Sequence, residues 1–223
     1  MEQVYVVIVA GGSGTRMQTD VPKQFLALAG KPVFIHTIEI FLKAIPQVNI
    51  ILVLPFPHIQ MGEELLKAHQ LIEKVSIVAG GETRFHSVKA GLHLTEDDGI
   101  VMVHDAVRCL VSGSLIQQCM KACLQHGSSI PLISCKDSMR MKNAETYNAV
   151  NRELFFSVQT PQSFKAKMLK NAFEQPYQPS FTDEASVAEQ IGATLHFMEG
   201  EEANIKITRP VDLIFAAHYL KHK

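Results

Sequence analysis

The sequence contains 223 residues, of which 47% are hydrophobic, 19% are charged and 7% are aromatic. Its 21 Lys and Arg residues are balanced by 22 Asp and Glu residues, so it lacks the basic surplus of proteins that bind nucleic acid by neutralising phosphates. The hydrophobic content excludes wholesale disorder, and the length permits one larger α/β domain or two small ones. Because no linker-like stretch interrupts the chain, we expect one domain over residues 1–223.

The first residues and the cysteines indicate where the protein works. Met1–Ala10 lack a basic segment and their apolar run ends at Gly11, which predicts a buried strand and neither a signal peptide nor a membrane span. The four cysteines form no CxxC pair and no zinc-binding pattern, so we expect free thiols and no metal held by protein ligands. We therefore expect a cytoplasmic protein without a membrane or nucleic-acid partner.

Short runs rich in Val and Ile alternate with longer amphipathic segments. The short runs predict buried strands at Val4–Val9, Asn49–Leu54, Ser76–Val78, Ile100–His104 and Ser129–Ile133. The longer segments predict helices at Pro32–Ala44, His58–Gln70, Ser87–Leu94, Ser112–His126, Phe164–Ala172, Asp183–Ile191 and Val211–Leu220. Ser112 and Thr182 are candidate N-caps. This alternation predicts a Rossmann-like α/β fold, with a mostly parallel sheet covered by helices on both faces.

The polar segment Cys135–Val158 departs from this alternation. Its weak alternation predicts a β-hairpin arm around Asn143–Thr146 that leaves the sheet. Segments of this length inside a compact domain are usually functional or disordered. The alternative is a solvated surface loop.

A glycine-rich turn follows the first strand directly, from Ala10 to Met17, and Pro22-Lys23-Gln24 comes after it. The turn is neither a Walker A loop nor a GxGxxG fingerprint, because Met17 stands where the third glycine would be. Glycine amides with Arg16 and Lys23 suit a triphosphate whose charge grows at one phosphorus in the transition state. The alternative is a glycine turn with incidental surface cations.

The segment from His104 to Arg108 ends the fourth predicted strand and so lies at the same carboxyl edge of the sheet. Asp105 could accept hydrogen bonds from a substrate hydroxyl or help hold a metal, and Arg108 could bind a phosphate. A structural Asp–Arg pair is the alternative. We expect His104 to be a packed histidine and not a catalytic base.

Two further segments carry polar groups at the ends of predicted elements. Gly80–Ser87 combines glycines, which permit close approach of a planar ring, with Ser87, which could contact that ring or simply cap a helix. Asn204–Pro210 predicts a short strand in which Lys206 points opposite to its apolar neighbours. An inward-facing lysine requires an anionic partner.

Together these motifs resemble the cytidylyltransferases of the non-mevalonate isoprenoid pathway, in order from residue 4 to about residue 220. The resemblance is carried by Ala10-Gly11-Gly12-x-Gly14-x-Arg16-Met17, Pro22-Lys23-Gln24, Gly81-Glu82-x-Arg84-x-x-Ser87, His104-Asp105-Ala106-x-Arg108, Thr160-Pro161-Gln162, Thr182-Asp183-Glu184-Ala185 and Asn204-Ile205-Lys206-x-Thr208-Arg209-Pro210. Each motif alone is loose, but the ordered set is specific.

The resemblance implies a fold of the nucleotide-diphospho-sugar transferase type and transfer of CMP from CTP to methylerythritol phosphate. Mg²⁺ would be bound mainly through the CTP phosphates. By the resemblance, Arg16 and Lys23 would stabilise the transition state at the α-phosphate. The nucleotide would be lined by Ala10, Gly11, Gly12 and Gly14, its cytosine recognised by Gly81, Glu82 and Ser87, and the acceptor held by Asp105, Arg108, Thr160 and Lys206.

The resemblance also implies a homodimer that exchanges its arms at about residues 135–158, so that each arm contributes to the neighbour's site. Ser138 and Arg152 match the arm positions that contact the substrate phosphate. The chain departs from the family pattern at Ser138, where threonine is frequent, and at Cys109, where a proline usually follows the arginine.

Three other functions remain open at this point. A pentitol phosphate cytidylyltransferase, such as the ribitol 5-phosphate enzyme, shares several motifs, but Thr182–Ala185 and Thr208–Pro210 resemble the isoprenoid enzymes more closely. A sugar-1-phosphate nucleotidyltransferase would use another nucleotide. A non-catalytic nucleotide-binding regulator would not need Arg16 and Lys23 together with Lys206.

Overall fold

The computed structural model describes residues 2–11 and 21–222. Within these residues the central sheet contains eight strands. Their order across the sheet is β10 (Phe156–Val158), β7 (Ser128–Ser134), β11 (Gln162–Lys165), β6 (Ile100–Asp105), β1 (Val4–Val9), β4 (Asn49–Leu54) and β5 (Val75–Ala79), with β12 (Phe197–Glu199) also paired to β7. β1 pairs in parallel with β4 and β6, and β4 pairs in parallel with β5. β10 and β11 run antiparallel to their neighbours, so the sheet is mixed but mostly parallel.

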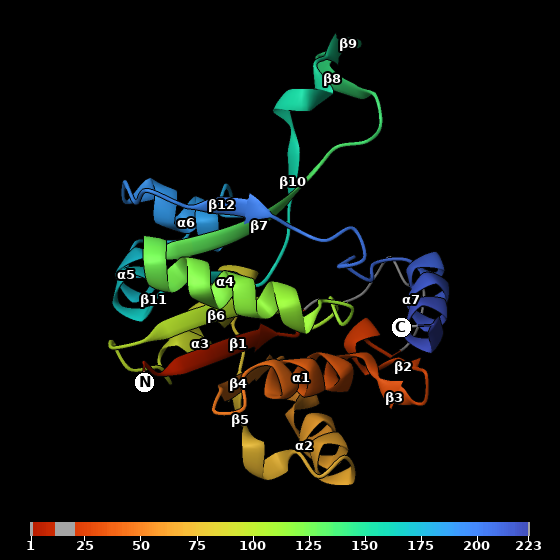
Figure 1. Cartoon of the computed structure of the whole chain (residues 1–223), viewed down its shortest axis with the longest axis vertical. Helices are drawn as coiled ribbons and strands as arrows, with labels where there is room; N and C mark the ends of the chain where they lie inside the picture. Colours follow the sequence, from red (N-terminus) through yellow and green to blue (C-terminus); the bar gives the residue numbers. More distant parts are fainter. Residues whose placement is uncertain (1, 12–20, 223) are drawn as a thin grey trace.

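Helices cover both faces of this sheet (Figure 1). These are α1 (Val33–Ala44), α2 (Ile59–Ala68), α3 (Arg84–Leu92), α4 (Gly113–His126), α5 (Ala166–Ala172) and α6 (Glu184–Gln190). α7 (Pro210–His222) packs in a separate cluster that includes Leu28 and Val33. Successive side chains of β1 point to opposite faces. Val6 and Ile8 therefore pack in the core beneath α1 and α4, whereas Val7 and Val9 pack in the core beneath α3 and α5. None of the helices in the described part of the chain is long and apolar enough to cross a membrane.

The predicted α/β fold with helices on both faces is confirmed, and the strands and most helices lie within a few residues of their predicted bounds. Ser112 caps α4 as predicted, because its hydroxyl accepts the N–H of Leu115. The N-cap candidate Thr182 was wrong, because Asp183 caps α6 through a capping box with Ser186. The alternative in which Ser87 caps a helix is also not observed, because Thr83 caps α3.

Two other predictions gave the wrong type of secondary structure. The expected helix Phe164–Ala172 begins only at Ala166, because Phe164 belongs to β11 and lies between β6 and β7. The expected strand Asn204–Pro210 forms neither helix nor strand before α7 begins at Pro210. Its hydrogen bonds do not form a ladder with a strand: the Ile207 N–H donates to the Val107 carbonyl, and Asp212 accepts the Thr208 N–H.

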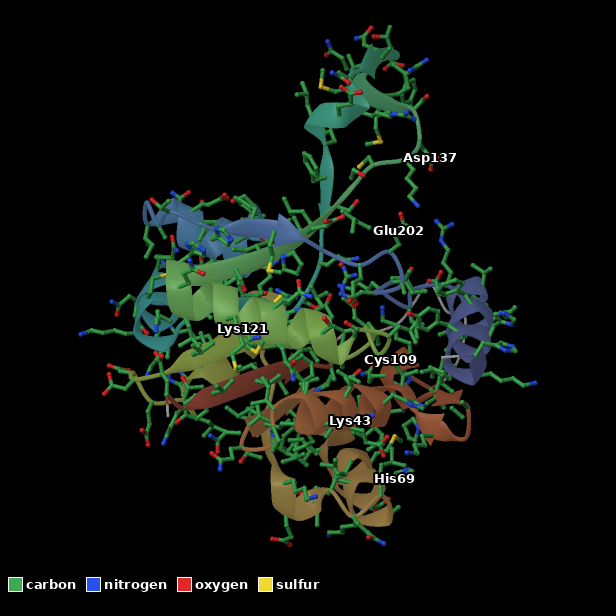
Figure 2. All side chains as sticks on the ribbon, viewed as in Figure 1. Lys43, His69, Cys109, Lys121, Asp137 and Glu202 are labelled. Carbon is green, nitrogen blue, oxygen red and sulfur yellow. The ribbon has the colours of Figure 1, made fainter. Side chains whose placement is uncertain are left out.

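The polar excursion contains the expected hairpin, formed by β8 (Met139–Asn143) and β9 (Thr146–Val150). Asn143 pairs with Thr146, and Ala144 takes a positive φ of 49° in the two-residue turn between them. Figures 1 and 2 show this hairpin and its side chains extending away from the body of the protein. A second small sheet pairs β2 (Ala27–Leu28) with β3 (Lys31–Pro32).

All four cysteines are free thiols. Cys119 and Cys123 are fully buried in the core between α4 and the sheet, as expected for small hydrophobic residues. Burial raises the pKa of Cys109, Cys119 and Cys123 to about 12, so these three thiols stay protonated and unreactive at neutral pH.

The close approach of α3 to the sheet gives a stability prediction. A Cβ atom at Gly91 would lie 2.5 Å from Val7 Cγ1 and 3.1 Å from Val53 Cγ2. We expect Gly91→Ala to lower the free energy of unfolding by about 1–3 kcal/mol through overpacking, although alanine favours helices over glycine by about 1 kcal/mol. Urea denaturation measures this difference.

Gly113→Ala is the matched control. A Cβ at Gly113 in the first turn of α4 would meet only Ala44 Cβ, at an ordinary 3.8 Å. We expect this variant to be neutral or slightly more stable. Equal stabilisation by both substitutions would contradict the tight contact between α3 and β1.

Candidate active site

A cavity of about 370 Å³ opens at the carboxyl ends of β1 and β6. It is lined by Val9, Ala10, Gly11, Lys23, Gln24, Gly81, Glu82, Thr83, Arg84, Ser87, Asp105, Val107 and Lys206. The cavity therefore brings together groups from the glycine turn, the Gly80–Ser87 segment, the end of β6 and the segment before α7. Ligands of open α/β sheets bind at this edge, so this cavity is the candidate active site.

Lys23 reaches the cavity from a short 3-10 turn, Lys23–Phe25, that begins after Pro22. Proline fixes the backbone at the start of such a turn. The buried side-chain amide of Gln24 donates to the Ala10 carbonyl at 2.7 Å, which joins the turn to the end of β1. The Lys23 side chain is thereby held beside the first residues of the glycine turn.

The loop before α3 folds back on its own first turn. Ser87 is buried, and its hydroxyl accepts the Gly81 N–H at 3.2 Å and donates to the Thr83 carbonyl at 3.0 Å. A Cβ at Gly81 would lie 2.4 Å from His86 Cβ, so this close turn requires glycine. Glu82 remains exposed at the loop tip. Ser87 thus shapes the loop as well as facing the cavity, whereas its predicted capping role belongs to Thr83.

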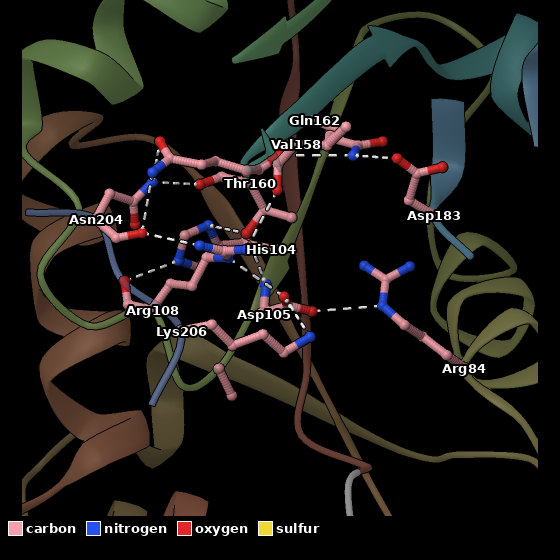
Figure 3. Close-up of polar contacts among 12 residues, drawn as sticks. Arg84, His104, Asp105, Arg108, Val158, Thr160, Gln162, Asp183, Asn204 and Lys206 are labelled. Atoms are coloured by element: carbon pink, nitrogen blue, oxygen red, sulfur yellow. Dashed lines mark hydrogen bonds and ion pairs between the residues drawn. The ribbon is translucent and has the colours of Figure 1, made fainter. Parts of the chain in front are cut away.

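Asp105 is the charged centre of the cavity (Figure 3). Its carboxylate contacts Lys206 Nζ at 2.9 Å, Arg108 Nε at 3.4 Å and Arg84 Nε at 3.4 Å. Asp105 is therefore the anionic partner that the sequence predicted for Lys206. The ion pair between Asp105 and Arg108, which the sequence left open as an alternative to substrate binding, is also present. Burial alone would raise the pKa of Asp105, but the three cations outweigh burial and hold this pKa below its usual range.

Two residues of this network were not among the predicted site residues. Arg84 donates from Nη1 and Nη2 to the two carboxylate oxygens of Glu184, at 2.5 and 3.1 Å. Glu184 is fully buried at the start of α6. Both residues lie in motifs that carry the family resemblance, but the pairing joins positions 100 residues apart and depends on the tertiary fold.

Beneath Asp105, His104 and Thr160 form a buried hydrogen-bond chain. The Asp105 N–H donates to Thr160 Oγ1 at 3.1 Å, and Thr160 Oγ1 lies 3.0 Å from His104 Nδ1. His104 Nε2 lies 3.2 Å from the Arg108 carbonyl, which can only accept, so Nε2 carries the proton and Nδ1 accepts from Thr160. Burial lowers the pKa of His104 to about 3. His104 is therefore a packed neutral histidine, as expected.

Arg108 and Thr160 lie behind the cavity wall. Arg108 Nη1 donates to the Asn204 carbonyl at 2.8 Å, and Asn204 Nδ2 donates to the Thr160 carbonyl at 2.8 Å. These bonds join the irregular segment that carries Lys206 to the end of β6. In this structure Arg108 and Thr160 contact Asp105 and the backbone, and they are not among the residues that line the cavity.

The remaining predicted residues divide into two groups. Gly12, Gly14 and Arg16 lie outside the described residues. Ser138 and Arg152 are exposed on the arm, where Arg152 Nη1 donates to the Lys136 carbonyl at 2.6 Å. The arm extends away from the body of the protein (Figure 1), and neither residue lines the cavity.

The described residues provide no cluster of three or more His, Cys, Asp or Glu side chains that could hold a metal ion. Asp105 is the carboxylate at the centre of the cavity, and its oxygens contact three cations. These protein groups do not fit a resident metal site.

Comparison with known proteins identifies the family. Residues 4–222 match the family model described as 2-C-methyl-D-erythritol 4-phosphate cytidylyltransferase. The chain belongs to this family. A relative of this name from Bacteroides thetaiotaomicron is 44% identical over 208 residues, which cover 93% of this chain and 95% of the relative. One from Porphyromonas gingivalis strain W83 is 42% identical over 219 residues and covers 97% of both chains.

Solved structures of cytidylyltransferases in this family share the fold. The Francisella tularensis 2-C-methyl-D-erythritol 4-phosphate cytidylyltransferase is similar with a TM-score of 0.80 at 30% identity, over 96% of this chain and 98% of that chain. The Thermus thermophilus protein of the same name gives a TM-score of 0.79 at 27% identity, over 99% of this chain and 100% of that one.

The buried neutral histidine of this cytidylyltransferase family member gives a pH prediction. His104 has a pKa of about 3 in the folded chain and about 6.5 when unfolded. Between these pH values His104 is protonated in the unfolded chain and neutral in the folded one. The free energy of unfolding that depends on neutral His104 is therefore lost as pH falls from about 6.5 to about 3. We expect this loss to approach 1.4 kcal/mol per pH unit inside that window.

His104→Gln isolates this contribution because glutamine does not titrate. The variant should be less stable than the wild type at pH 7, and the difference between them should shrink as pH falls to 4.5. Urea denaturation at both pH values measures the difference. A constant difference would show that His104 is not held neutral.

Proposed function

We propose that the protein transfers CMP from CTP to 2-C-methyl-D-erythritol 4-phosphate, with release of pyrophosphate, in non-mevalonate isoprenoid precursor synthesis. Family membership and the relatives' names support this activity. The observation that carries it is the cavity, in which Lys23, Lys206 and Asp105 lie with the glycine backbone at one sheet edge. Such a set of cations and amides suits a reaction between two phosphate-bearing substrates.

On the nucleotide side, the Ala10–Gly14 turn lines the triphosphate and its backbone amides face the phosphates. Gly81, Glu82 and Ser87 recognise the cytosine. The support is geometric: Gly11, Gly81 and Ser87 line the same cavity, so the two segments lie close together. One nucleotide can therefore touch both.

On the acceptor side, Asp105 and Lys206 hold methylerythritol phosphate. The buried carboxylate accepts hydrogen bonds from the acceptor's hydroxyl groups, because its pKa is held low and it stays ionised at neutral pH. Arg108 and Thr160 assist by fixing Asp105 and the Lys206 segment, which is the role their contacts support.

The reaction needs no general base. A phosphate oxygen of the acceptor already carries negative charge and attacks the α-phosphorus of CTP; the bond from that phosphorus to the bridging oxygen breaks, and pyrophosphate leaves with the electron pair. The barrier comes from bringing two anions together, and Lys23 and Arg16 lower it by neutralising charge at the α-phosphate. His104 is unsuited to be a base because it is buried beneath Asp105.

Mg²⁺ enters as part of the substrate, the magnesium complex of CTP. Lys23, Arg84 and Lys206 are cations that line the cavity, and its central carboxylate, Asp105, already contacts three cations. Substrate phosphates are the usual ligands of Mg²⁺ in such sites.

The protein acts as a homodimer whose arms are exchanged, so that Ser138 and Arg152 contact the acceptor phosphate in the neighbouring subunit's cavity. Two observations support this assembly. The arm extends away from the body of the protein (Figure 1), and Arg152 does not line the cavity of its own chain. It also exposes large apolar side chains, namely Met141, Tyr147, Leu154, Phe155 and Phe156, at 40–75% of their surface. Exposed apolar surface of this kind marks protein contacts.

The activity is tested by pyrophosphate release with purified protein and Mg²⁺. We expect turnover with CTP and methylerythritol phosphate, and little with UTP, ATP or GTP, or with ribitol 5-phosphate as the acceptor. Faster turnover with ribitol 5-phosphate, or with another nucleotide, would contradict the proposed substrates.

Lys23→Ala and Arg16→Ala test the catalytic cations in the same assay. Each removes charge at the α-phosphate, and loss of one such donor costs about 10²–10³ in kcat. We expect kcat to fall by at least this factor while circular dichroism and thermal unfolding stay near those of the wild type. A near-normal kcat would remove that residue from the proposed mechanism.

Mixing two inactive variants tests arm exchange. Lys23→Ala damages the body of a site and Arg152→Ala damages the arm, so a heterodimer of the two contains one intact site. Random subunit mixing should restore about a quarter of the wild-type activity, because half of the dimers carry one active site of two. Activity no higher than the sum of the separate variants would contradict exchanged arms.

A further inference from the structure

Glu184 and Arg84 form an ion pair, half-buried at Arg84 and fully buried at Glu184, that the proposed reaction does not yet use. The Glu184 side chain is fully buried, and both of its oxygens receive guanidinium nitrogens of Arg84. Arg84 lines the cavity. Glu184 lies on α6, and no described residue of α6 lines the cavity. The hydrogen bonds of the Glu184 carboxylate go to Arg84, so Arg84 is the direct connection between Glu184 and the cavity.

Stability alone explains this pair poorly. Moving two charges out of water costs several kcal/mol for each ion, so a buried pair is often no more stable than well-packed apolar residues of similar size. The apolar cluster of Phe85, Phe173 and Phe181 lies directly beside this region on α3 and its neighbours. An apolar pair could extend that cluster.

The geometry instead fixes the orientation of the guanidinium. Because Nη1 and Nη2 of Arg84 are both bound by Glu184, Nε is the edge that faces Asp105 Oδ1, at 3.4 Å (Figure 3). Asp105 Oδ2 is left to Lys206 and Arg108. Glu184 thus determines which part of Arg84 reaches the central carboxylate.

Glu184 is itself held in place from the sheet. The Gln162 side chain donates to Asp183 Oδ2 at 2.9 Å and accepts the Ala185 N–H at 2.9 Å, on the two sides of Glu184. Gln162 is buried in β11, opposite Val103 of β6, two residues before Asp105. In the series of contacts from Glu184 through Arg84 to Asp105, both end residues are therefore held by neighbouring strands: Glu184 through Gln162 of β11, and Asp105 as the last residue of β6.

We propose that Glu184 is a positioning residue for acceptor binding: it holds Arg84 so that Asp105 keeps the orientation in which it accepts the acceptor's hydroxyl groups. The proposal rests on the proposed function, in which Asp105 binds methylerythritol phosphate. Without the Glu184 charge, the Nη groups of Arg84 turn toward Asp105 and cover the carboxylate. Acceptor binding then weakens, while the nucleotide loops keep their shape.

The experiment compares Glu184→Gln with the wild type in pyrophosphate release, varying CTP and acceptor in turn. The wild type must first turn over both substrates, which tests the proposed function separately. We expect Glu184→Gln to raise the acceptor KM by about tenfold or more and to leave the CTP KM within about twofold. Equal rises in both KM values, or no change, would overturn the positioning role.

Glu174→Gln is the matched control. Glu174 pairs with Lys89, which also lies on α3, but at 3.5 Å on the exposed surface and away from the cavity. The substitution removes the same charge from an ion pair of the same helix. Its kinetic constants should match the wild type, and an acceptor KM raised as much as in Glu184→Gln would overturn the proposal.

A double-mutant cycle tests whether Glu184 acts through Arg84. If it does, Arg84→Gln combined with Glu184→Gln should raise the acceptor KM no more than Arg84→Gln alone, within about twofold. Multiplying effects would show independent roles and contradict the proposal. The double variant leaves no unpaired buried charge, so it remains informative if Glu184→Gln fails to fold. An acceptor KM in the double variant well above that of Arg84→Gln alone would overturn the proposal, because Glu184 would then act without Arg84.

Discussion

The neutralisation of Asp105 is the interaction on which the candidate site depends. One buried carboxylate at the end of β6 contacts Arg84 from α3, Arg108 from the following turn and Lys206 from the segment before α7. Three cations brought together without this anion would repel one another in a poorly hydrated cavity. Asp105 therefore lets the fold assemble an anion-binding site, and the hydrogen bonds of Thr160 and His104 fix the backbone beneath it.

Much of the fold could be predicted because the strands are short apolar runs and the helices are amphipathic. The failures have tertiary causes. Phe164 reads as part of a helix by its apolar spacing, but its place between β6 and β7 makes it a strand residue. The Lys206 segment alternates like a strand, yet Arg108 and Gln159 bind the backbone carbonyl of Asn204 there, so it does not pair with a sheet.

The candidate site could be predicted from the sequence to about the same extent as the fold. Motifs at the carboxyl ends of strands must meet, so Lys23, Asp105 and Lys206 share one cavity. The Arg84–Glu184 pair was not predicted, because the two positions are 100 residues apart in the sequence and only the tertiary fold brings them together. The overall charge of −1 gave no hint of the cavity's cations, since acidic residues elsewhere balance them. The net charge is a sum over the whole chain, so it does not reveal a local cluster of cations in one pocket.

Asp105→Asn tests the central role of this carboxylate most directly, because asparagine keeps the shape and removes the charge. In a steady-state assay of pyrophosphate release, kcat/KM for methylerythritol phosphate should fall by about 100-fold or more. The reason is that the substitution removes a buried, charged hydrogen-bond acceptor. CTP binding, measured by calorimetry, should change by only a few-fold. Equal losses for both substrates, or wild-type kinetics, would contradict the account.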